Sequence, residues 1–345
     1  MKNYVKMRHI MIFMTLLLCI SFGQAAVADV APGDVIDKST WQKLEGLLPK
    51  EMIDLVEQGK LTDLKIGTLS YDPYEYLPAQ VTKNHESNKD RYDVDKDGLL
   101  VDRKTGKYPN DLEGIPFPGV NENTPEAGIK IAHNLRFFRQ SIGHINFQSQ
   151  LLWVGPKGLE RSVDALYYEF KYTSNPQTAG LQNRKNVQRL NITKITAPFD
   201  VAGTAIMLWS YEGPTLDNTY AYVPSIRRVR RTSPASRSDA MFGSDFAIDD
   251  AAMYDGKIAA MKWTLLEKGE GLIGFVDKHP FRAATTMDGS IMTPKDHPAV
   301  QYGFEVEGWK GAPWAPTNLT WVKRKVYVVE ANHKNRYYNY GKQVF

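Results

Sequence analysis

The sequence contains very little cysteine: Cys19 is the only one among 345 residues, and it lies in an apolar run near the N-terminus. A single thiol excludes a disulfide within the chain and a zinc site built from several thiolates. The stability of the protein must therefore come from burial of apolar surface. The chain is long enough for one large core or two smaller ones.

The sequence also lacks the common catalytic motifs. It has no G-x-S-x-G nucleophile elbow, no P-loop and no H-E-x-x-H zinc motif. Its histidines, including His133 and His144, do not have the spacing of metal ligands. The sequence therefore predicts no metal, no cofactor and no catalytic constellation, which favours a protein that is not an enzyme.

Net charge is small, and the N-terminus accounts for most of it. The chain carries 43 basic and 39 acidic residues. Three basic residues, an apolar run over residues 10–20 and the small pair Ala26 and Ala28 form the pattern of a signal peptide that is cleaved before Asp29. Removing residues 1–28 leaves 43 minus 3, or 40, basic residues against 39 acidic ones. This balance does not favour a nucleic-acid partner. We expect export to the periplasm, with an uncleaved membrane anchor as the alternative.

Helix signals are concentrated in the region that follows, residues 29–144. Capping and apolar patterns predict two short helices, one with Ser39 or Thr40 as its N-cap and one with Pro49 at its first position. A third helix begins at Thr124-Pro125-Glu126. Its predicted buried face consists of Ala127, Ile131, Leu135 and Phe138. The rest of this region is rich in turns, so we expect a helical and loop-rich N-terminal extension.

Three aspartates within residues 93–98 have the spacing that opens a calcium-binding loop. In an EF-hand the twelfth position supplies a bidentate glutamate, and that position is Lys104 here. Asp97-Gly98 between apolar residues is also a strong hairpin signal. A plain hairpin is therefore favoured over a calcium site.

From residue 145 the hydrophobic period changes from 3.6 to 2. Strand-like runs occur at residues 147–154, 166–172, 205–211, 219–223, 258–267, 301–306 and 319–329. Turn signals separate them, including Gly155-Pro156-Lys157-Gly158 and Lys268-Gly269-Glu270-Gly271. Successive strands without long helices between them predict one large antiparallel sheet over residues 145–345.

Positive charge is concentrated in residues 220–231. On an extended strand Arg228 and Arg230 point one way, whereas Arg227, Val229 and Arg231 point the other. Such arginines bind phosphate or carboxylate groups in a bidentate manner. Two alternatives remain open, a solvated edge that prevents aggregation and internal pairing with aspartates. The aspartates considered are Asp239, Asp245, Asp249 and Asp250.

Four motifs occur together in the mature chain. They are Gly114-Ile-Pro-Phe-Pro118, Tyr220-x-Tyr-x-Pro-x-x-Arg-Arg-Val-Arg-Arg231, Gly243-Ser-Asp-Phe246 with Asp249-Asp250, and Trp321-Val-x-Arg-x-Val-Tyr-Val-Val-Glu330. With them the chain resembles the bacterial family catalogued as domain of unknown function 1329. It is also similar to outer-membrane lipoprotein-sorting proteins, the LolA/LolB-like group. The resemblance implies an α+β fold in which a curved antiparallel sheet, an incomplete barrel, wraps around helices and an apolar cavity. It also implies two partners, a resistance-nodulation-division transporter and an outer-membrane barrel protein.

Pattern and resemblance together predict a periplasmic binding or carrier protein for a lipid, acyl chain or lipoprotein, serving an envelope transport system. The expected ligand-binding residues are Trp153, Tyr168, Phe170, Met207, Trp209 and Trp263 on the concave face, with Arg228 and Arg230 at the mouth. Two alternatives are a carboxylate-based hydrolase, which would use the four aspartates, and a structural accessory subunit of a transporter complex. Members of the family usually continue beyond the segment that matches residues 337–345. We therefore also expect a truncated C-terminal region with an unpaired strand edge.

Overall fold

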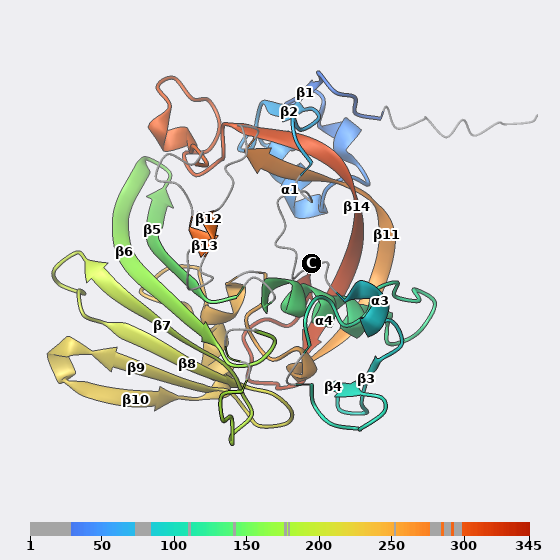
Figure 1. Cartoon of the computed structure of the whole chain (residues 1–345). Coiled ribbons are helices and arrows are strands. Elements are labelled where there is room, and N and C mark those ends of the chain that lie inside the picture. Colours follow the sequence, from blue (N-terminus) through green and yellow to red (C-terminus); the bar gives the residue numbers. More distant parts are fainter. Residues whose placement is uncertain are drawn as a thin grey trace, which may run out of the picture.

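Two β-sheets form most of the structure, a computed structural model (Figure 1). It describes residues 29–72, 84–109, 112–140, 143–175, 178, 180–251, 253–276, 284–285, 291–292 and 299–345. The predicted signal peptide, residues 1–28, lies outside the described residues. None of the described helices has the length and apolar character needed to cross a membrane.

The first sheet has six antiparallel strands in the order β10-β9-β8-β7-β6-β5. These strands are β5 (Ile145–Gly155), β6 (Gly158–Lys171), β7 (Val187–Ala197), β8 (Ala205–Tyr211), β9 (Asn218–Val223) and β10 (Arg228–Thr232). Each strand pairs with the next one in sequence, so this sheet is the meander that the period of two predicts. The β5–β6 hairpin turns at Pro156 and Lys157, as its turn signal predicts. Strand β7 is absent from the predicted runs.

The second sheet combines strands from distant parts of the sequence. They are β1 (Val35–Ile36), β2 (Leu64–Ile66), β11 (Met261–Val276), β14 (Leu319–His333) and β15 (Gln343–Val344). The long antiparallel pair of β11 and β14 forms its centre. Strand β2 runs parallel to β14, whereas the other pairs are antiparallel. The single antiparallel sheet that the sequence predicts is therefore two sheets, one of which contains a parallel pair.

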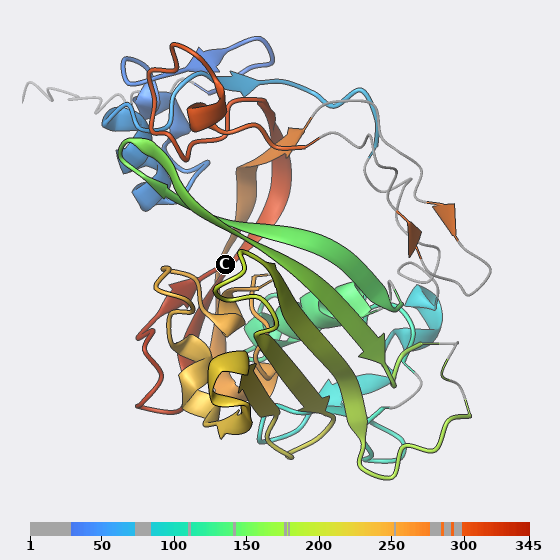
Figure 2. The same ribbon diagram turned by 90° about the vertical axis from the view of Figure 1, so that its left-hand side faces the viewer.

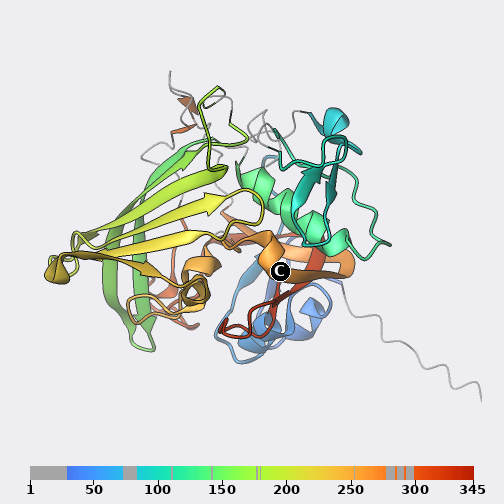
Figure 3. The same cartoon turned by 90° about the horizontal axis from the view of Figure 1, so that it is seen from below.

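The two sheets curve around the interior without closing into a barrel (Figures 1 and 3). No described strand of one sheet pairs with a strand of the other. Helix α4 (Ala127–Gln140) crosses β11, and a Cβ atom at Gly128 would lie 2.8 Å from the amide nitrogens of Thr264 and Leu265. The β5–β6 hairpin reaches the loop that carries η8 (Gly303–Glu305), where a Cβ atom at Gly158 would lie 3.8 Å from Phe304 (Figure 2). This arrangement confirms an α+β fold with an incomplete barrel.

Short helices and two small hairpins complete the fold. The helices are η1 (Trp41–Leu44), α1 (Lys50–Glu57), α3 (His85–Asn88), η4 (Pro224–Ile226), η5 (Pro234–Ser238), η6 (Ile248–Asp250) and η7 (Ile258–Ala260). The hairpins pair β3 (Tyr92–Val94) with β4 (Leu100–Asp102), and β12 (Ala284–Thr285) with β13 (Ile291–Met292). The helices predicted after Thr40 and Pro49 are present as η1 and α1.

The aspartate-rich segment at residues 93–98 forms the predicted hairpin. The Oδ1 atom of Asp95 accepts hydrogen bonds from the backbone N–H groups of Asp97 and Leu99, both at 2.9 Å. A side chain that binds the backbone two residues ahead stabilises a tight turn. In the described part of the chain, no group of three or more His, Cys, Asp or Glu side chains is arranged to hold a metal ion.

Two predictions about strands are wrong. Residues 268–271 are not a turn, because β11 continues through them. Gly271 leaves room there for the chain that precedes α1, and Leu272 donates a backbone hydrogen bond to the carbonyl oxygen of Leu47 at 2.9 Å. Residues 301–306 contain the one-turn helix η8 and a single bridge between Tyr302 and Pro316 instead of a strand.

The predicted buried face of α4 is also only partly correct. Ala127 is buried as expected, but Leu135 is 39% exposed. Ala132, His133 and Phe137 are buried instead. The helix lies between the β3–β4 hairpin and the second sheet (Figures 1 and 3). It therefore buries residues on two sides, whereas the prediction assumed a single apolar face.

Buried apolar side chains form separate groups. The largest packs η1, α1, β1 and β2 against Leu272 and Trp321. A second joins α4 to β11 and β14, a third lies under the β3–β4 hairpin, and a fourth lies on the six-stranded sheet. Side chains of the first, second and fourth groups also line the cavities described below.

Candidate ligand-binding cavities

A cavity of about 960 Å³ lies against the second sheet. Strands β11 and β14, the loop that leads into α1, and α4 all contribute to its lining. Its volume is within the roughly 300–1,000 Å³ of small-molecule sites. Trp263, one of the predicted ligand-binding residues, lines it and is fixed by a hydrogen bond from Nε1 to the carbonyl oxygen of Ile258 at 2.8 Å. We call this space the first cavity.

Large apolar side chains line the first cavity while remaining in contact with solvent. Leu135, Met253, Ile273, Tyr327 and Val344 are between 37% and 50% exposed. They come from α4, the segment after η6, β11, β14 and β15, so the fold brings them together from distant positions. Single exposed apolar residues are ordinary on a protein surface, but a contiguous apolar hollow indicates a binding site.

Charged side chains of both signs also line the first cavity. They are Lys50, Glu51, Glu267, Glu270 and Lys342, together with Arg136. Lys50 pairs with Asp54 at 2.8 Å, and Lys342 lies 3.9 Å from Glu330. Because the lining contains three basic and three acidic side chains, it does not favour one sign of ligand charge.

A second cavity of about 500 Å³ lies on one face of the six-stranded sheet. Its lining follows a row of cross-strand partners from β5 to β8, namely Phe147, Tyr167, Thr193 and Ile206. The rings of Phe147 and Tyr167 stack with their centroids 4.7 Å apart. Trp153, another predicted ligand-binding residue, lines this cavity and donates from Nε1 to the carbonyl oxygen of Gly243 at 3.3 Å.

The segment around residue 253 separates the two cavities. Met253 and Tyr254 line the first cavity, whereas Ala251 and Asp255 line the second. The position of this segment therefore sets the shape of both cavities.

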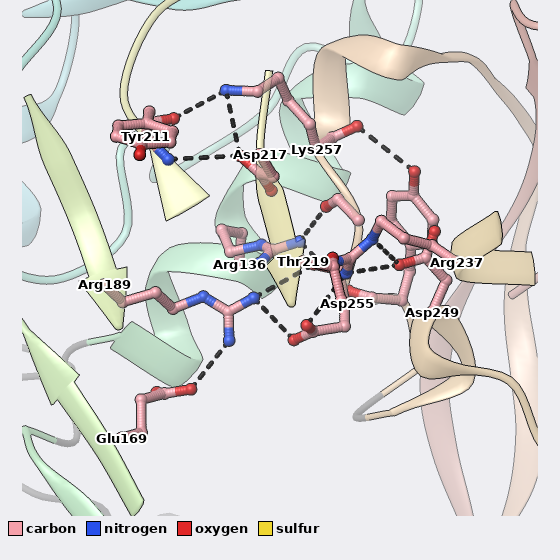
Figure 4. A network of polar contacts seen from close by, with 12 residues as sticks. Arg136, Glu169, Arg189, Tyr211, Asp217, Thr219, Arg237, Asp249, Asp255 and Lys257 are labelled. Atoms are coloured by element: carbon pink, nitrogen blue, oxygen red, sulfur yellow. Dashed lines mark hydrogen bonds and ion pairs between the residues drawn. The ribbon is translucent and has the colours of Figure 1, made fainter. Parts of the chain in front are cut away.

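A buried network of ion pairs holds Asp255 in place (Figure 4). Arg189 Nη2 lies 2.8 Å from Asp255 Oδ1, and Arg237 Nη2 lies 3.2 Å from Asp255 Oδ2. Arg189 also binds Glu169 at 2.8 Å, and Arg237 binds Asp249 at 2.6 Å. All five side chains are buried. Since Glu169 lies on β6 and Arg189 on β7, the network ties the six-stranded sheet to the segment between the cavities.

Neighbouring hydroxyl groups satisfy more of this buried charge. The hydroxyl of Tyr338 donates to Asp249 Oδ2 at 2.9 Å, and that of Tyr167 donates to Glu169 Oε2 at 2.5 Å. Burial raises the pKa of Asp249, while Arg237 acts in the opposite direction. Buried charges that share ion pairs and hydrogen bonds hold one another in position. We infer that this network holds the segment between the two cavities in position.

The predicted ligand-binding residues do not share one cavity, since Trp263 lines the first cavity and Trp153 the second. Four of them lie on the opposite face of the six-stranded sheet from the second cavity: Tyr168, Phe170, Met207 and Trp209. The register shows this, because Ile192 pairs with both Tyr168 and Met207 on that face. Glu169, which lies between Tyr168 and Phe170 in β6, points inward to Arg189. The side chains on either side of it in β6 must therefore face outward.

Arg228 and Arg230 lie on β10, the edge strand of the six-stranded sheet, and both are exposed. They do not line either cavity. Arg231 is the member of this cluster that makes a hydrogen bond, to the side-chain oxygen of Asn218. The predicted partner Asp249 is bound instead by Arg237, which lies outside the arginine-rich run at residues 220–231.

The four aspartates considered for hydrolysis do not converge on a shared site. Asp249 is buried in the ion-pair network. Asp250 accepts a hydrogen bond from the backbone of Ala247 at 2.7 Å, and Asp239 accepts one from Asn339 at 2.9 Å. Asp245 is exposed.

Comparisons with known proteins give a family and two distant structures. The family described as "Protein of unknown function (DUF1329)" matches residues 35–345. A Vibrio parahaemolyticus domain that is named for outer membrane lipoprotein sorting is 17% identical, with a TM-score of 0.38, and the match covers 64% of this chain and 66% of that one. A DUF1329 family protein from Desulfovibrio piger is 15% identical, with the same TM-score and coverage. Both matches thus span slightly less than two thirds of the solved chain. No curated protein matches.

Proposed function

The chain belongs to the DUF1329 family, and from the first cavity we propose that it binds an apolar or amphiphilic ligand such as an acyl chain, a lipid or the lipid part of a lipoprotein. The single observation that carries the proposal is the set of partly exposed apolar side chains that share this cavity. Without a ligand these side chains leave apolar surface in water, which costs about 25 cal/mol for each Å².

The gain from apolar burial and the cost of association have similar sizes, so the net affinity ranges from negligible to useful. Burying a chain of about sixteen methylene groups at roughly 0.8 kcal/mol each yields about 13 kcal/mol. Association costs on the order of 4–15 kcal/mol. Apolar burial therefore accounts for most of the affinity, and the mixed charges of the lining adjust the position of the head group.

A titration with a fluorescent fatty acid tests the proposal. Ile273, 42% exposed, lines the first cavity, whereas Ile192, 36% exposed, lies between Tyr168 and Met207 on the outer face of the six-stranded sheet. Both isoleucines are in strands and have similar exposure, so they form a matched pair. Ile273→Glu places a carboxylate in the cavity, and we expect at least tenfold weaker binding. Ile192→Glu should bind as the wild type does.

Three results would count against this site. Loss of binding in Ile192→Glu alone would move the ligand to the outer face, where Tyr168, Phe170, Met207 and Trp209 lie. Equal binding by both variants and the wild type would remove the first cavity from the proposal. Absence of binding by the wild type, for a fatty acid and for a phospholipid, would remove ligand binding altogether.

The proposal includes a location and a role. We place the mature protein in the periplasm, as a carrier for an envelope transport system with a resistance-nodulation-division transporter and an outer-membrane barrel protein as partners. The pattern of the first 28 residues supports export. Sequencing the N-terminus of periplasmic material tests it: Asp29 as the first residue supports the proposal, and a retained Met1 contradicts it.

A further inference from the structure

Two turns lie side by side at one end of the six-stranded sheet. Residues 198–204 connect β7 to β8, and residues 224–227 connect β9 to β10. They are in contact, because a Cβ atom at Gly203 would lie 3.1 Å from Pro224 Cγ. Figures 1 and 3 both show these turns at the outer end of the sheet, away from α4 and the second sheet. We call residues 198–204 and 223–230 the tip.

The tip exposes apolar side chains that nothing in the described structure covers. Phe199 is 97% exposed, Val229 is 63% exposed and Ile226 is 44% exposed. A phenylalanine that is almost fully in water contributes nothing to a core. Together with its neighbours it forms an apolar surface at the end of the molecule.

The same tip carries positive charge that is not neutralised. Arg227, Arg228 and Arg230 are exposed, and the described residues provide no ion pair for any of them. Asp200, also exposed, is the acidic residue of these two turns, and Lys194 adds a further base near the end of β7. The local charge is therefore clearly positive, although the mature chain is close to neutral as a whole.

We propose that the tip docks on the surface of an anionic lipid bilayer. Arginine side chains bind lipid phosphates through bidentate hydrogen bonds, and an aromatic ring beside them enters the head-group region. Neither contact alone gives stable attachment, but charge and apolar insertion together do. The inference is independent of the first cavity, since no tip residue lines it.

Co-sedimentation with vesicles tests the docking on the mature protein. Vesicles of phosphatidylglycerol and phosphatidylcholine should bind it, and vesicles of phosphatidylcholine alone should not. Binding should weaken when salt is raised from about 0.1 to 0.5 M, because salt screens exposed charges. Addition of 10 mM inorganic phosphate at constant ionic strength should leave vesicle binding unchanged; competition by phosphate would indicate a free-anion site and overturn the bilayer assignment.

Matched variants distinguish binding through the tip from a non-specific attraction between the whole protein and the anionic vesicles. Arg228→Glu with Arg230→Glu should weaken vesicle binding at least about tenfold, since each basic residue near the membrane contributes on the order of a fivefold factor. The control is Arg184→Glu with Lys185→Glu, which changes the charge equally at the other end of β7, roughly 35 Å away for an 11-residue strand.

An apolar pair of variants completes the design. Phe199→Ser should weaken binding, whereas Leu181→Ser, at a residue that is 53% exposed and lies near the control pair, should not. Ile273→Glu, in the first cavity, should bind vesicles as the wild type does. Equal losses in the tip and control variants, or no binding to phosphatidylglycerol vesicles by the wild type, would overturn the proposal.

Discussion

His133 should make the stability of this protein fall as the pH falls below 7. The side chain lies on α4, is buried, and has Nε2 3.0 Å from the carbonyl oxygen of Gly98. Burial lowers its pKa from 6.5 to about 4; the hydrogen bond to Gly98 and the charge of Asp95 oppose the change, and Arg136 and Lys257 add to it. The folded protein therefore keeps this imidazole neutral at pH values at which the unfolded chain protonates it.

The sign and size of the effect follow from these two pKa values. Below the unfolded pKa of 6.5, the unfolded state binds a proton that the folded state does not bind until about pH 4. The stabilising contribution is thus complete above about pH 6.5 and is lost as the pH falls toward 4. The difference between 6.5 and about 4, at about 1.36 kcal/mol per pH unit, amounts to about 3 kcal/mol, of which about 2 kcal/mol is lost by pH 5.

The measurement is urea unfolding of the wild type and His133→Gln between pH 7.5 and 5. Glutamine retains an N–H donor for Gly98 but does not titrate. Glu212 and Asp249, whose pKa values are raised by burial, contribute with the opposite sign, but they are present in both proteins and cancel in the comparison. We expect the wild type to lose about 2 kcal/mol more than the variant over this range. Parallel stability profiles for the two proteins would refute the reasoning.

Two other predictions concern the packing that positions the cavities. Gly128→Ala should lower the free energy of unfolding by about 1–3 kcal/mol, because its Cβ atom would lie 2.8 Å from backbone atoms of β11, whereas Gly341→Ala, with open space around it, should change it by less than about 0.5 kcal/mol. Equal stabilities in urea would contradict the crossing of α4 over β11. Arg189→Met should cost about 3–5 kcal/mol, since it leaves Glu169 and Asp255 buried with one partner fewer. A loss below about 1 kcal/mol in the same assay would show that the network does not hold the segment between the cavities.

The sequence predicts the strands of the meander well where one face is apolar. The β5–β6 hairpin and β8 occur where the period of two and the turn signals place them. The same period does not say which face of a strand points inward. In β6 the inward set includes Glu169 and Lys171, which are buried as an ion pair with each other, and Glu169 also pairs with Arg189 on β7. A prediction that points apolar side chains to the interior therefore assigns the two faces of β6 the wrong way round. For this reason Tyr168 and Phe170 lie on the outer face of the sheet.

Two further features depend on contacts that sequence patterns do not report. Strand β7 alternates the polar residues Arg189, Asn191 and Thr193 with Leu190 and Ile192. The polar set faces the second cavity and the buried ion pairs, so a rule that points apolar side chains to the interior would assign its two faces the wrong way round. In β11 the glycines at 269 and 271 resemble a turn signal, but the strand continues through them. The glycine at 271 instead leaves space for the chain before α1.

The parallel pairing of β2 with β14 has a consequence for how the protein folds during synthesis. Lys65 lies opposite Thr320, so β2, near the start of the sequence, cannot pair with β14 until the C-terminal part of the chain has been made. Contacts between residues so far apart in sequence form slowly, because a long loop must close before they are made. A chain that leaves the ribosome N-terminus first would carry η1, α1 and β2 without the strand that completes their core. We therefore expect the second sheet, and with it the first cavity, to form only after the whole chain has emerged, while the meander of the first sheet needs only neighbouring strands.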